Sequence, residues 1–375
     1  MAFDAPDSMS VRMPLEEWFD RYQYAVTSNI GESAVTSLSL ADLPLSAEEL
    51  WKLPLRYGHH QGLPELRAAI AAHYPGLTAE DIVVTAGAGE AIVVLATVLL
   101  NGRSRAVVEH PTYPTLYLVP RSRGASVELL RLRPDRQWRP DLEEVRASLA
   151  GGAEFFAITH PNNPTGSMIS EAELRSVVAI ARDAGVRLVS DETYGLMTEG
   201  EPLPPAACLD ERAVSISTMS KTFGLPGIRI GWIACRDREL VRRLVACREH
   251  ITITNNVLGE YIALQVQRDP GPFVARARAR VAGNRTVVAD VVRRHPRLGW
   301  VPPSAGVVAL PWIVDATDEQ AEQVYRNLAE NRGTFVVPAS GFELPGRYFR
   351  VGFGGEPHQL RAGLGHLVAE LDALS

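Results

Sequence analysis

Short apolar runs alternate with longer amphipathic stretches through much of this chain. Each run is a few residues long, rich in Val, Ile and Phe and bounded by turn residues, which is typical of buried strands. One predicted strand begins at Ile82, and the others span Arg105–Glu109, Phe155–Thr159, Arg187–Ser190 and Ile230–Ala234. Helical patterns follow several of them. This alternation predicts an α/β fold, a three-layer sandwich around a mainly parallel sheet, with ligands at the carboxyl ends of the strands.

Helical patterns also flank this central region. The predicted helices span Pro14–Tyr22, Ala68–His73, Glu171–Ala184, Glu239–His250, Pro270–Arg294, Glu319–Asn331 and Gln359–Leu374, besides one that ends at Leu100. Residues 1–40 are expected to form an N-terminal arm, loose over residues 1–13, and part of a small domain. Residues 41–280 would form the large domain. Residues 281–375 would form a smaller α+β domain with a strand over 347–353.

Composition and charge limit the classes of function. The chain has 375 residues, 46% of them hydrophobic, which is enough for a large core. A net charge of −6 without a basic tract argues against nucleic acid and anionic membranes as partners, and no apolar run reaches transmembrane length. Residues 1–10 lack the apolar centre of a signal peptide, and three cysteines without metal-ligand spacing are expected to be reduced. We therefore expect a cytoplasmic protein. The adjacent His59 and His60 have no third partner and favour a polar loop over a metal site.

One lysine stands among residues that suit a phosphate. The chain has only two lysines, Lys52 and Lys221, although arginine is abundant, so position 221 is expected to need an amine rather than a charge. An amine can attack a carbonyl and form a Schiff base, which a guanidinium cannot do. The neighbouring Thr218, Ser220 and Arg229 are suited to holding a phosphate. Together these residues suit a ligand that carries both an aldehyde and a phosphate, which indicates pyridoxal 5'-phosphate (PLP). The alternative is a surface lysine in a turn, and Lys52, without such neighbours, is assigned no role.

The stretch from Ser217 to Trp232 resembles a known signature. Its sequence is similar to the Ser-x-Ser-Lys-x-Phe-Gly-Leu-Pro-Gly-x-Arg-x-Gly motif of class I/II aminotransferases, which are PLP enzymes of fold type I. Further motifs of that family follow in its order. The Gly-x-Gly turn that ends at Gly89 is by itself a weak signal, since a dinucleotide site would want a third glycine. The resemblance implies that Ala88 and Gly89 donate backbone N–H groups to the cofactor phosphate, at the start of a helix.

Other motifs imply roles around the cofactor ring. The loop over residues 160–166 resembles the family's Asn-Pro-Thr-Gly loop, so Asn163 is expected to bind the phenolic oxygen of PLP, with Tyr194 as the second partner. Tyr113 matches the tyrosine that stacks on the ring. Asp191 matches the aspartate that keeps the ring nitrogen protonated, although a lone aspartate in such a place could equally be an N-cap.

Tyr57 carries the prediction of a partner subunit. The segment from Arg56 to Arg67 resembles the family's Tyr-x-x-x-x-Gly-x-x-x-Leu-Arg motif, whose tyrosine reaches the neighbouring subunit's cofactor phosphate. The resemblance therefore implies a homodimer with active sites at the interface. The alternative for Tyr57 is a turn aromatic packed on its own domain.

Two arginines compete for the substrate carboxylate. Arg350 occupies the family position, and its planar fork suits a carboxylate, whereas Arg347 should face the other side of the strand. Gly31 and Glu32 lie where related enzymes line the substrate mouth, and Asn163 is expected to contribute to substrate binding. Glu32 could meet a cationic substrate side chain, or it could be a solvated loop carboxylate.

These residues predict an enzyme with Lys221, Asp191 and Tyr194 as catalytic groups. The majority outcome in the family is amino transfer at the α-carbon of an L-amino acid, with the freed lysine amine as general base. The segments 14–18 and 29–33 are similar to those of capreomycidine synthase and of PLP-dependent arginine oxidases of specialised metabolism. Elimination, cyclisation or oxidation is therefore the alternative outcome.

Two non-enzyme alternatives lack sequence support. A transcription regulator on this scaffold would need an added basic helix-turn-helix region, for which the acidic arm leaves no room. A cofactor-free binding protein would be expected to have lost Lys221 or Asp191, and both are present.

Overall fold

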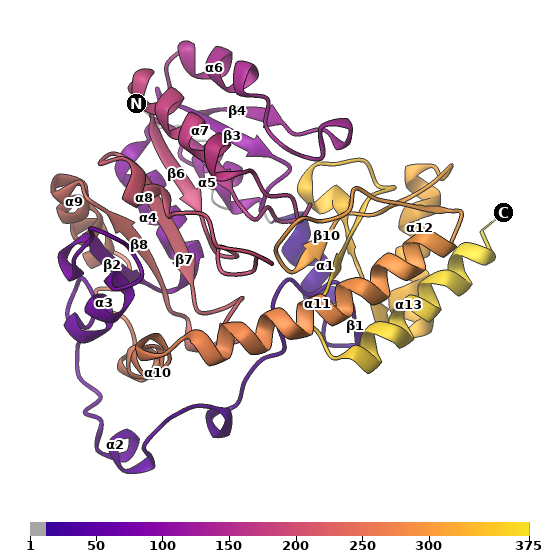
Figure 1. Ribbon diagram of the computed structural model, residues 1–375, viewed down its shortest axis with the longest axis horizontal. Coiled ribbons are helices and arrows are strands. Elements are labelled where there is room, and N and C mark those ends of the chain that lie inside the picture. Colours follow the sequence, from indigo (N-terminus) through magenta and orange to yellow (C-terminus); the bar gives the residue numbers. More distant parts are fainter. Residues whose placement is uncertain (1–12, 375) are drawn as a thin grey trace, which may run out of the picture.

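A seven-stranded sheet forms the centre of the larger part of the molecule in the computed structural model, which describes residues 13–374 (Figure 1). The predicted loose arm thus lies, apart from its last residue, outside the described residues. The strand order is β2-β8-β7-β6-β5-β3-β4, and every neighbouring pair is parallel except the two that β8 makes. The strands are β2 (Ile82–Thr85), β3 (Arg105–His110), β4 (Ser126–Arg131), β5 (Phe155–Thr159), β6 (Arg187–Asp191), β7 (Val214–Thr218) and β8 (Gly231–Cys235). The prediction of a mainly parallel sheet is confirmed.

Helices cover both faces of this sheet, because alternate strand residues point to opposite sides and nearly all of them are apolar. Val108, Ala157 and Val189 belong to the core shared with α4, α5 and α9, whereas Val107 and Ile158 pack on the other face with α6, α7 and α8. On that second face α3 and α10 pack beside β2 and β8. The helices are α3 (Pro64–Ala71), α4 (Gly87–Leu99), α5 (Thr115–Ser122), α6 (Leu142–Ala150), α7 (Glu171–Asp183), α8 (Ala206–Leu209), α9 (Arg238–Glu249) and α10 (Val257–Arg268). The predicted three-layer α/β sandwich is confirmed.

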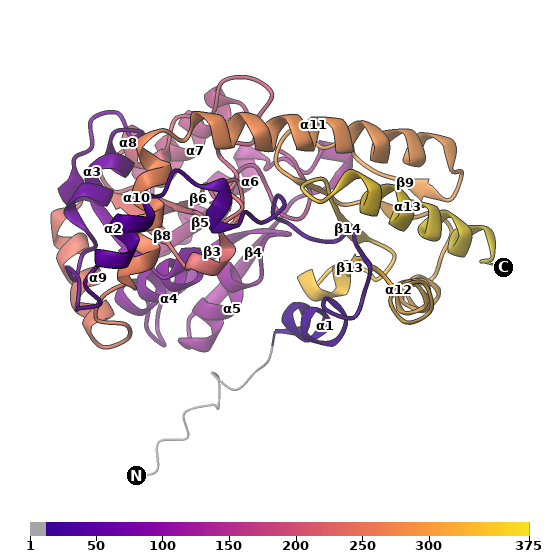
Figure 2. The ribbon, with the colours of Figure 1, turned by 90° about the horizontal axis from the view of Figure 1, so that it is seen from below.

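The smaller part combines short strands with helices from both ends of the chain (Figure 2). Its strands pair as β10-β14-β13, β1-β12 and β9-β11. The long helix α11 runs along the molecule from the larger part into the smaller one, and α2 lies on an arm away from the sheet (Figures 1 and 2). The elements are α1 (Pro14–Tyr22), α2 (Ala47–Lys52), α11 (Gly271–Arg294), α12 (Asp318–Arg332), α13 (Pro357–Asp372), β1 (Ser28–Asn29), β9 (Leu298–Gly299), β10 (Val308–Ala309), β11 (Trp312–Ile313), β12 (Thr334–Phe335), β13 (Val337–Pro338) and β14 (Phe349–Gly352).

Local sequence signals set several boundaries. Pro14 begins α1, and the Ser170 side chain accepts the Glu173 N–H to cap α7. Gly333 ends α12 with φ 58°, a left-handed conformation that favours glycine. The strand expected over 347–353 is shorter, since Arg347 lies outside β14. After Asn29, where β1 ends, the chain turns toward the site described below.

Three further observations concern possible partners. Over residues 13–374 no helix is both long and apolar enough to cross a membrane, and no three His, Cys, Asp or Glu side chains gather as metal ligands would. His60 instead pairs with Glu249, at 2.6 Å between Nδ1 and Oε1. Cys208, Cys235 and Cys247 are free thiols.

Candidate active site

A cavity of about 700 Å³ lies between the larger and smaller parts. Its walls come from α1, from the segment after β1, from the loop after β3, from the turn after β7 and from β14. Four predicted site residues line it together: Glu32, Tyr113, Lys221 and Arg350. Because Lys221 and Tyr113 follow the carboxyl ends of their strands, the cavity occupies the edge of the sheet where ligands are expected.

Lys221 follows β7 and points its amine at the segment after β1. Its Nζ donates a hydrogen bond to Ser33 Oγ at 3.0 Å and lies 3.7 Å from Glu32 Oε1. Desolvation lowers the pKa of the Lys221 amine, an effect that Glu32 opposes and that the Arg350 charge reinforces. A lowered pKa increases the unprotonated fraction, which is the form that acts as nucleophile or base.

Asp191 is the last residue of β6 and is buried. Its Oδ1 accepts the Thr193 N–H at 3.0 Å. Burial raises the pKa of the Asp191 carboxyl, while the hydrogen bonds from Thr193 and the charge of Lys221 lower it. A cation beside this carboxyl would keep it ionised.

Arg350 lies on β14 and is only 1% exposed. Its Nε and Nη2 donate to the Gly31 carbonyl at 3.1 and 2.8 Å, and its Nη1 donates to Asn163 Oδ1 at 3.2 Å. Burial lowers the pKa of this guanidinium. No carboxylate among residues 13–374 forms an ion pair with Arg350, so a buried charge faces the cavity without an acidic partner. Arg347 lies before β14 begins and is exposed over the Tyr348 ring, whereas Arg350 is buried and lines the cavity.

The two tyrosines predicted near the cofactor ring are both tied to the N-terminal region. Tyr194 is buried, and its hydroxyl donates to the Ser33 carbonyl at 2.8 Å. Tyr113 lines the cavity and donates to Glu16 Oε1 at 2.7 Å. Burial raises the pKa of both phenols, so both remain protonated donors at neutral pH.

The residues predicted to hold a phosphate also meet in space. Thr218 Oγ1 lies 3.0 Å from Ser220 Oγ, and Arg229 Nη1 donates to that same Ser220 oxygen at 3.4 Å. Arg229 Nη2 also donates to the Ala86 carbonyl at 3.3 Å, at the start of α4. That helix has no side-chain cap, so the N–H groups of its first turn, where Ala88 and Gly89 lie, remain for another acceptor.

Gly87 makes this arrangement possible. Its φ is 79°, and a Cβ there would lie 2.6 Å from Arg229 Nη2. Two hydroxyls, a guanidinium and an open helix N-terminus are the donor set that binds a phosphate ester, so these residues fit the phosphate of PLP.

Tyr57 lies apart from this cavity. It is 79% exposed and borders a separate groove with Leu55 and Asn256. Within the described chain it packs on neither the phosphate-binding residues nor Lys221, so its expected role requires a second copy of the chain. Asn255 also borders this groove, and its side chain is buried against Val84 and Glu260.

Sequence reasoning missed three residues of the cavity. Ser33 accepts from Lys221, Glu16 accepts from Tyr113, and the Phe19 ring lies 5.7 Å from the Arg350 guanidinium carbon. Glu16, Phe19 and Gln23 follow a helical spacing on α1, and all three line the cavity. That spacing was a signal that this helix presents one face to the site.

Comparisons with known proteins agree with this geometry. The family model for aminotransferase class I and II matches residues 53–367. Capreomycidine synthase of Streptomyces vinaceus is 28% identical over 367 residues, covering 96% of this chain and 93% of that protein. The aromatic aminotransferase ISS1 of Arabidopsis thaliana is 27% identical, covering 85% of this chain and 82% of its own.

Solved structures give the same result. A PLP-dependent aminotransferase from Streptococcus suis superposes with a TM-score of 0.91 at 27% identity, covering 97% of this chain and 98% of that one. The PLP-dependent cyclase OrfR gives a TM-score of 0.91 at 29% identity, with the same coverage. The family match over most of the length agrees with the α/β fold and with the lysine and buried aspartate of the site. The chain therefore belongs to the class I and II aminotransferase family, whose cofactor is PLP.

Proposed function

We propose that this chain is a PLP-dependent aminotransferase that acts at the α-carbon of an L-amino acid. The observation that carries this proposal is the convergence of Lys221 and Arg350 on one cavity with Asp191 behind them. The Lys221 charge is close enough to lower the pKa of Asp191, and Arg350 in turn lowers that of Lys221. An amine of lowered pKa, a buried carboxylate and a buried guanidinium that lacks an acidic partner are the groups such a reaction requires.

The chain offers a set of groups for each end of the cofactor. Asp191 would pair with the ring nitrogen, and Tyr113 would cover the ring face. Asn163 and Tyr194 would bind the phenolic oxygen. The phosphate would be held by Ala88, Gly89, Thr218, Ser220 and Arg229, with Tyr57 contributed by a partner subunit. Bound PLP supplies an aldehyde that links to amines and a ring that withdraws electrons from the α-carbon.

Lys221 would first hold the cofactor and then, once displaced by the incoming amino acid, take the α-proton on its Nζ. Its lowered pKa favours the free amine that this step needs. Ser33 Oγ, 3.0 Å from Nζ, would orient the amine. Asp191 would remain ionised and hold a proton on the ring nitrogen, since the cation offsets the cost of burying its charge.

Arg350 would bind the substrate α-carboxylate with the help of Asn163. The Gly31 carbonyl fixes its guanidinium through two hydrogen bonds, and a side chain at Gly31 would clash with Val337 at 2.9 Å. Nη1 already points at Asn163, so the guanidinium is oriented before the substrate arrives.

The acidic residues at the cavity mouth support a polar or cationic substrate side chain. Glu32 lies 3.7 Å from the Lys221 amine, and both Glu32 and Glu16 act electrostatically on Lys221 and Arg350. Once Lys221 is the uncharged amine that the reaction needs, it no longer offsets the charge of Glu32. A cationic group on the substrate would then take that place.

A homodimer in the cytoplasm fits these roles. Trp51, Leu55 and Tyr57 are 94%, 78% and 79% exposed on the arm that carries α2, an apolar surface that a second copy would cover. Mixing Lys221→Ala chains with Tyr57→Ala chains tests this arrangement. One site of each mixed dimer then has both residues intact, so activity above that of either parent is expected. Activity no greater than that of the parents would contradict a shared site.

A second candidate function is cyclisation or elimination without amino transfer. The acidic mouth favours it, because a cationic side chain held near the α-carbon could itself react, and two of the relatives described above are a capreomycidine synthase and a cyclase.

Incubation of the holoenzyme with an amino-acid panel, with and without a 2-oxo acid, separates the two candidates. We expect product only when the acceptor is present, together with a new amino acid derived from it. Product that forms without any acceptor would replace the first candidate with the second. Absence of an aldimine-type visible absorption band after addition of PLP would contradict both.

A further inference from the structure

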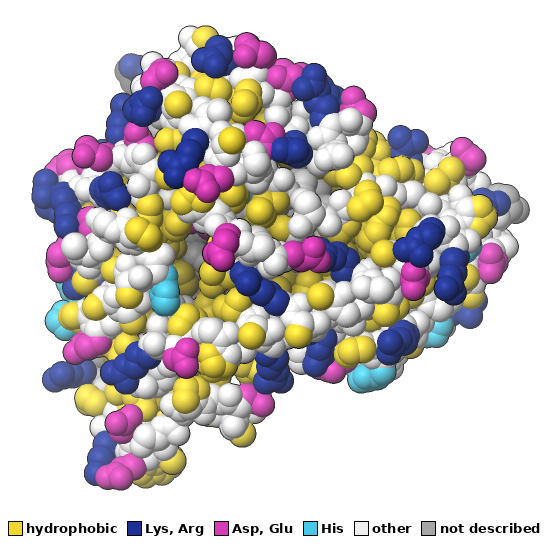
Figure 3. Space-filling view, viewed as in Figure 1, with side chains coloured by type: hydrophobic (Ala, Val, Ile, Leu, Met, Phe, Trp, Pro, Cys, Tyr) yellow, Lys and Arg dark blue, Asp and Glu magenta, His cyan; other side chains and the backbone are white. Residues whose placement is uncertain are grey.

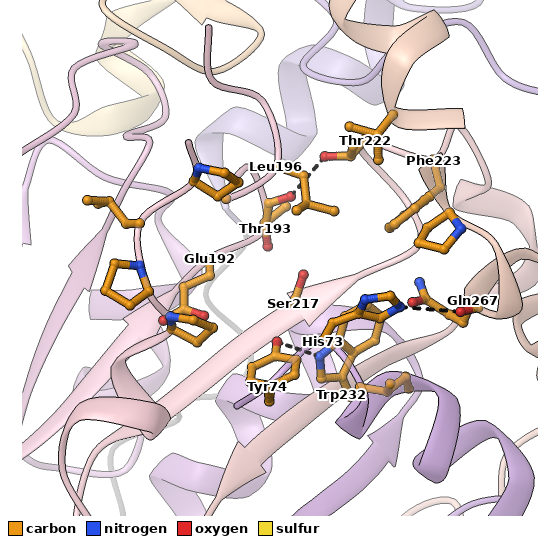
Figure 4. A pocket seen from close by; sticks show the side chains of 18 of the residues that line it. His73, Tyr74, Glu192, Thr193, Leu196, Ser217, Thr222, Phe223, Trp232 and Gln267 are labelled. Atoms are coloured by element: carbon orange, nitrogen blue, oxygen red, sulfur yellow. Dashed lines mark hydrogen bonds between the residues drawn. The ribbon is translucent and has the colours of Figure 1, made fainter. Parts of the chain in front are cut away.

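A second cavity, of about 510 Å³, lies on the face of the seven-stranded sheet that α3 and α10 cover. Figure 4 shows the side chains that line it. It is enclosed by the sheet, the end of α3, the start of α11 and the loop over 202–205 that precedes α8. The space-filling view shows the molecule hollowed on this side, between the strands of the larger part and α11 (Figure 3). A cavity of this volume accommodates a small organic molecule.

This cavity lies directly behind the catalytic residues. Asp191 faces the cofactor side, and the next residue, Glu192, lines the second cavity. Likewise Thr222 and Phe223 line it, immediately after Lys221. The Thr222 hydroxyl lies 3.4 Å from the Thr193 carbonyl, so the two loops meet at the cavity wall. A molecule bound there would contact the same loops that carry the active-site groups.

The walls are mostly apolar and partly aromatic. The Tyr74, Phe223 and Trp232 rings line the space, with Leu203 and Val274 among the aliphatic residues. Trp232 Nε1 donates to the Tyr74 hydroxyl at 2.8 Å, which fixes both rings. Figure 4 shows Glu192 and Phe223 on opposite sides of the space. Fixed rings around an open volume suit a compact aromatic or branched aliphatic group.

One carboxylate, that of Glu192, and several hydroxyl groups are among the polar side chains that line this cavity. Glu192 Oε1 accepts the Ala206 N–H at 2.8 Å and the Ser215 hydroxyl at 2.7 Å, which orients the carboxyl, and the side chain remains only half-buried because it borders the cavity. The Ser217 hydroxyl, central in Figure 4, makes no hydrogen bond within residues 13–374. A carboxylate and a free hydroxyl favour a ligand that donates hydrogen bonds.

His160 adds a further polar side chain to the lining. Its Nε2 lies 3.0 Å from Glu109 Oε1, and both side chains are buried. The second ring nitrogen, Nδ1, needs a hydrogen-bond partner of its own. That Nδ1 is buried and has no hydrogen-bond partner among the described residues. A native protein seldom leaves such an atom unpaired unless something else pairs with it.

The one cationic side chain of the lining lies at the rim. Arg278 on α11 donates to the Leu196 carbonyl at 2.7 Å and borders a neighbouring groove as well. The charge that faces the interior is therefore that of Glu192. From these contacts we propose that the cavity binds a small organic cation, with an apolar body of aromatic or branched aliphatic type and one protonated amine directed at Glu192.

N,N-dimethylphenethylamine is a suitable probe, because a tertiary amine cannot condense with the cofactor aldehyde at Lys221. Calorimetric titration into the holoenzyme should give a dissociation constant in the millimolar range or below, with 2-phenylethanol and 3-phenylpropanoate binding more weakly. Equal affinity for the amine and the alcohol, stronger binding of the acid, or no binding of the amine would each overturn the proposal.

Two matched carboxylate variants locate the binding. Glu192→Gln, which keeps an acceptor for Ala206 and Ser215, should weaken amine binding about tenfold by removing the charge-assisted hydrogen bond, and should leave the alcohol unaffected. Glu32→Gln removes a carboxylate on the cofactor side and should leave amine binding unchanged. A loss in Glu32→Gln, or none in Glu192→Gln, would place the amine elsewhere and refute the assignment.

A filling substitution tests the cavity itself. Val274 lines it from α11 and is half-buried, so Val274→Trp would place an indole in the open space. We expect amine binding to disappear while conversion of amino acids continues, which also shows that the variant folds. Retained amine binding in an active Val274→Trp enzyme would show that the ligand does not occupy this cavity.

Discussion

The two faces of the central sheet differ in chemistry although the same strands supply both. On the cofactor side, Asp191 and Lys221 bring opposite charges close together. On the opposite side, the next residues along the chain, Glu192 and Thr222, line a cavity with mainly apolar walls. A shift of one position along the chain, just after β6 and β7 end, therefore separates a reactive site from a binding cavity.

The electrostatics of the two faces differ in the same way. Lys221 and Asp191 have pKa values shifted in opposite directions by burial. The Lys221 charge partly offsets the cost of burying Asp191, and Glu32 does the same for Lys221. Glu192 has no such partner, and burial raises its pKa to about 7. Compensated charges suit a site that must keep them ionised, whereas an uncompensated acid can be neutralised or paired by a ligand.

Lys221 and Thr222 give the largest expected difference between the faces. Lys221→Ala should lower turnover about 10⁴-fold or more, because the variant lacks both the nucleophile and the base. Thr222→Val, whose side chain lies on the other side, should keep turnover within a few-fold of the parent enzyme. Steady-state assays measure both, and borohydride reduction of holoenzyme followed by mass spectrometry should find the label on residue 221 only. Comparable losses of turnover in the two variants would show that the two faces do not differ in their part in the reaction.

Asp191 and Glu192 make the same comparison at neighbouring acids. Asp191→Asn should lower kcat about 10²–10³-fold, since a neutral amide cannot hold the proton on the ring nitrogen. Glu192→Gln should change kcat little. The visible spectrum of Asp191→Asn holoenzyme should shift as well, because the ring nitrogen loses its ionic partner. A Glu192→Gln enzyme as impaired as Asp191→Asn would show that both faces take part in the reaction.

Much of this organisation was predictable from local patterns. Apolar runs and capping residues placed five of the seven strands of the sheet and most helices, because each depends on a few neighbouring residues, whereas β4 and β7 were not predicted. The contacts of Ser33 and Glu16 were not predictable, since they arise where α1 and the segment after β1 fold back on strands far along the chain. The second cavity was missed for the same reason, because its walls come from α3, α11 and three strands.

Arg350 and Arg347 offer a smaller comparison, within the smaller part. Arg350→Lys should raise KM about tenfold to a hundredfold with a lesser effect on kcat, because an ammonium cannot make the bidentate contact with a carboxylate. Arg347→Lys, at the surface, should leave both constants unchanged. Initial-rate measurements over a range of amino-acid concentrations separate the two constants. An unchanged KM in Arg350→Lys would assign the carboxylate to another group.

The smallest expected effect is a change in stability with pH that belongs to the second cavity alone. The folded-state pKa of Glu192 is raised to about 7 from an ordinary 4.5, so the folded protein keeps this proton over a range where the unfolded chain releases it. The Glu192 contribution to stability is therefore most favourable below pH 4.5, falls as the pH rises from 4.5 to about 7, and stays low above that.

Glutamine does not titrate, so Glu192→Gln should gain stability relative to the parent on going from pH 5 to pH 8, by about 1–3 kcal/mol. Urea unfolding of both holoenzymes at the two pH values measures this difference, with Glu201→Gln in the exposed loop before α8 as the control that should show none. If the difference in unfolding free energy between Glu192→Gln and the parent stayed constant or fell with rising pH, Glu192 would already be ionised at pH 5. The second cavity would then carry a fixed negative charge.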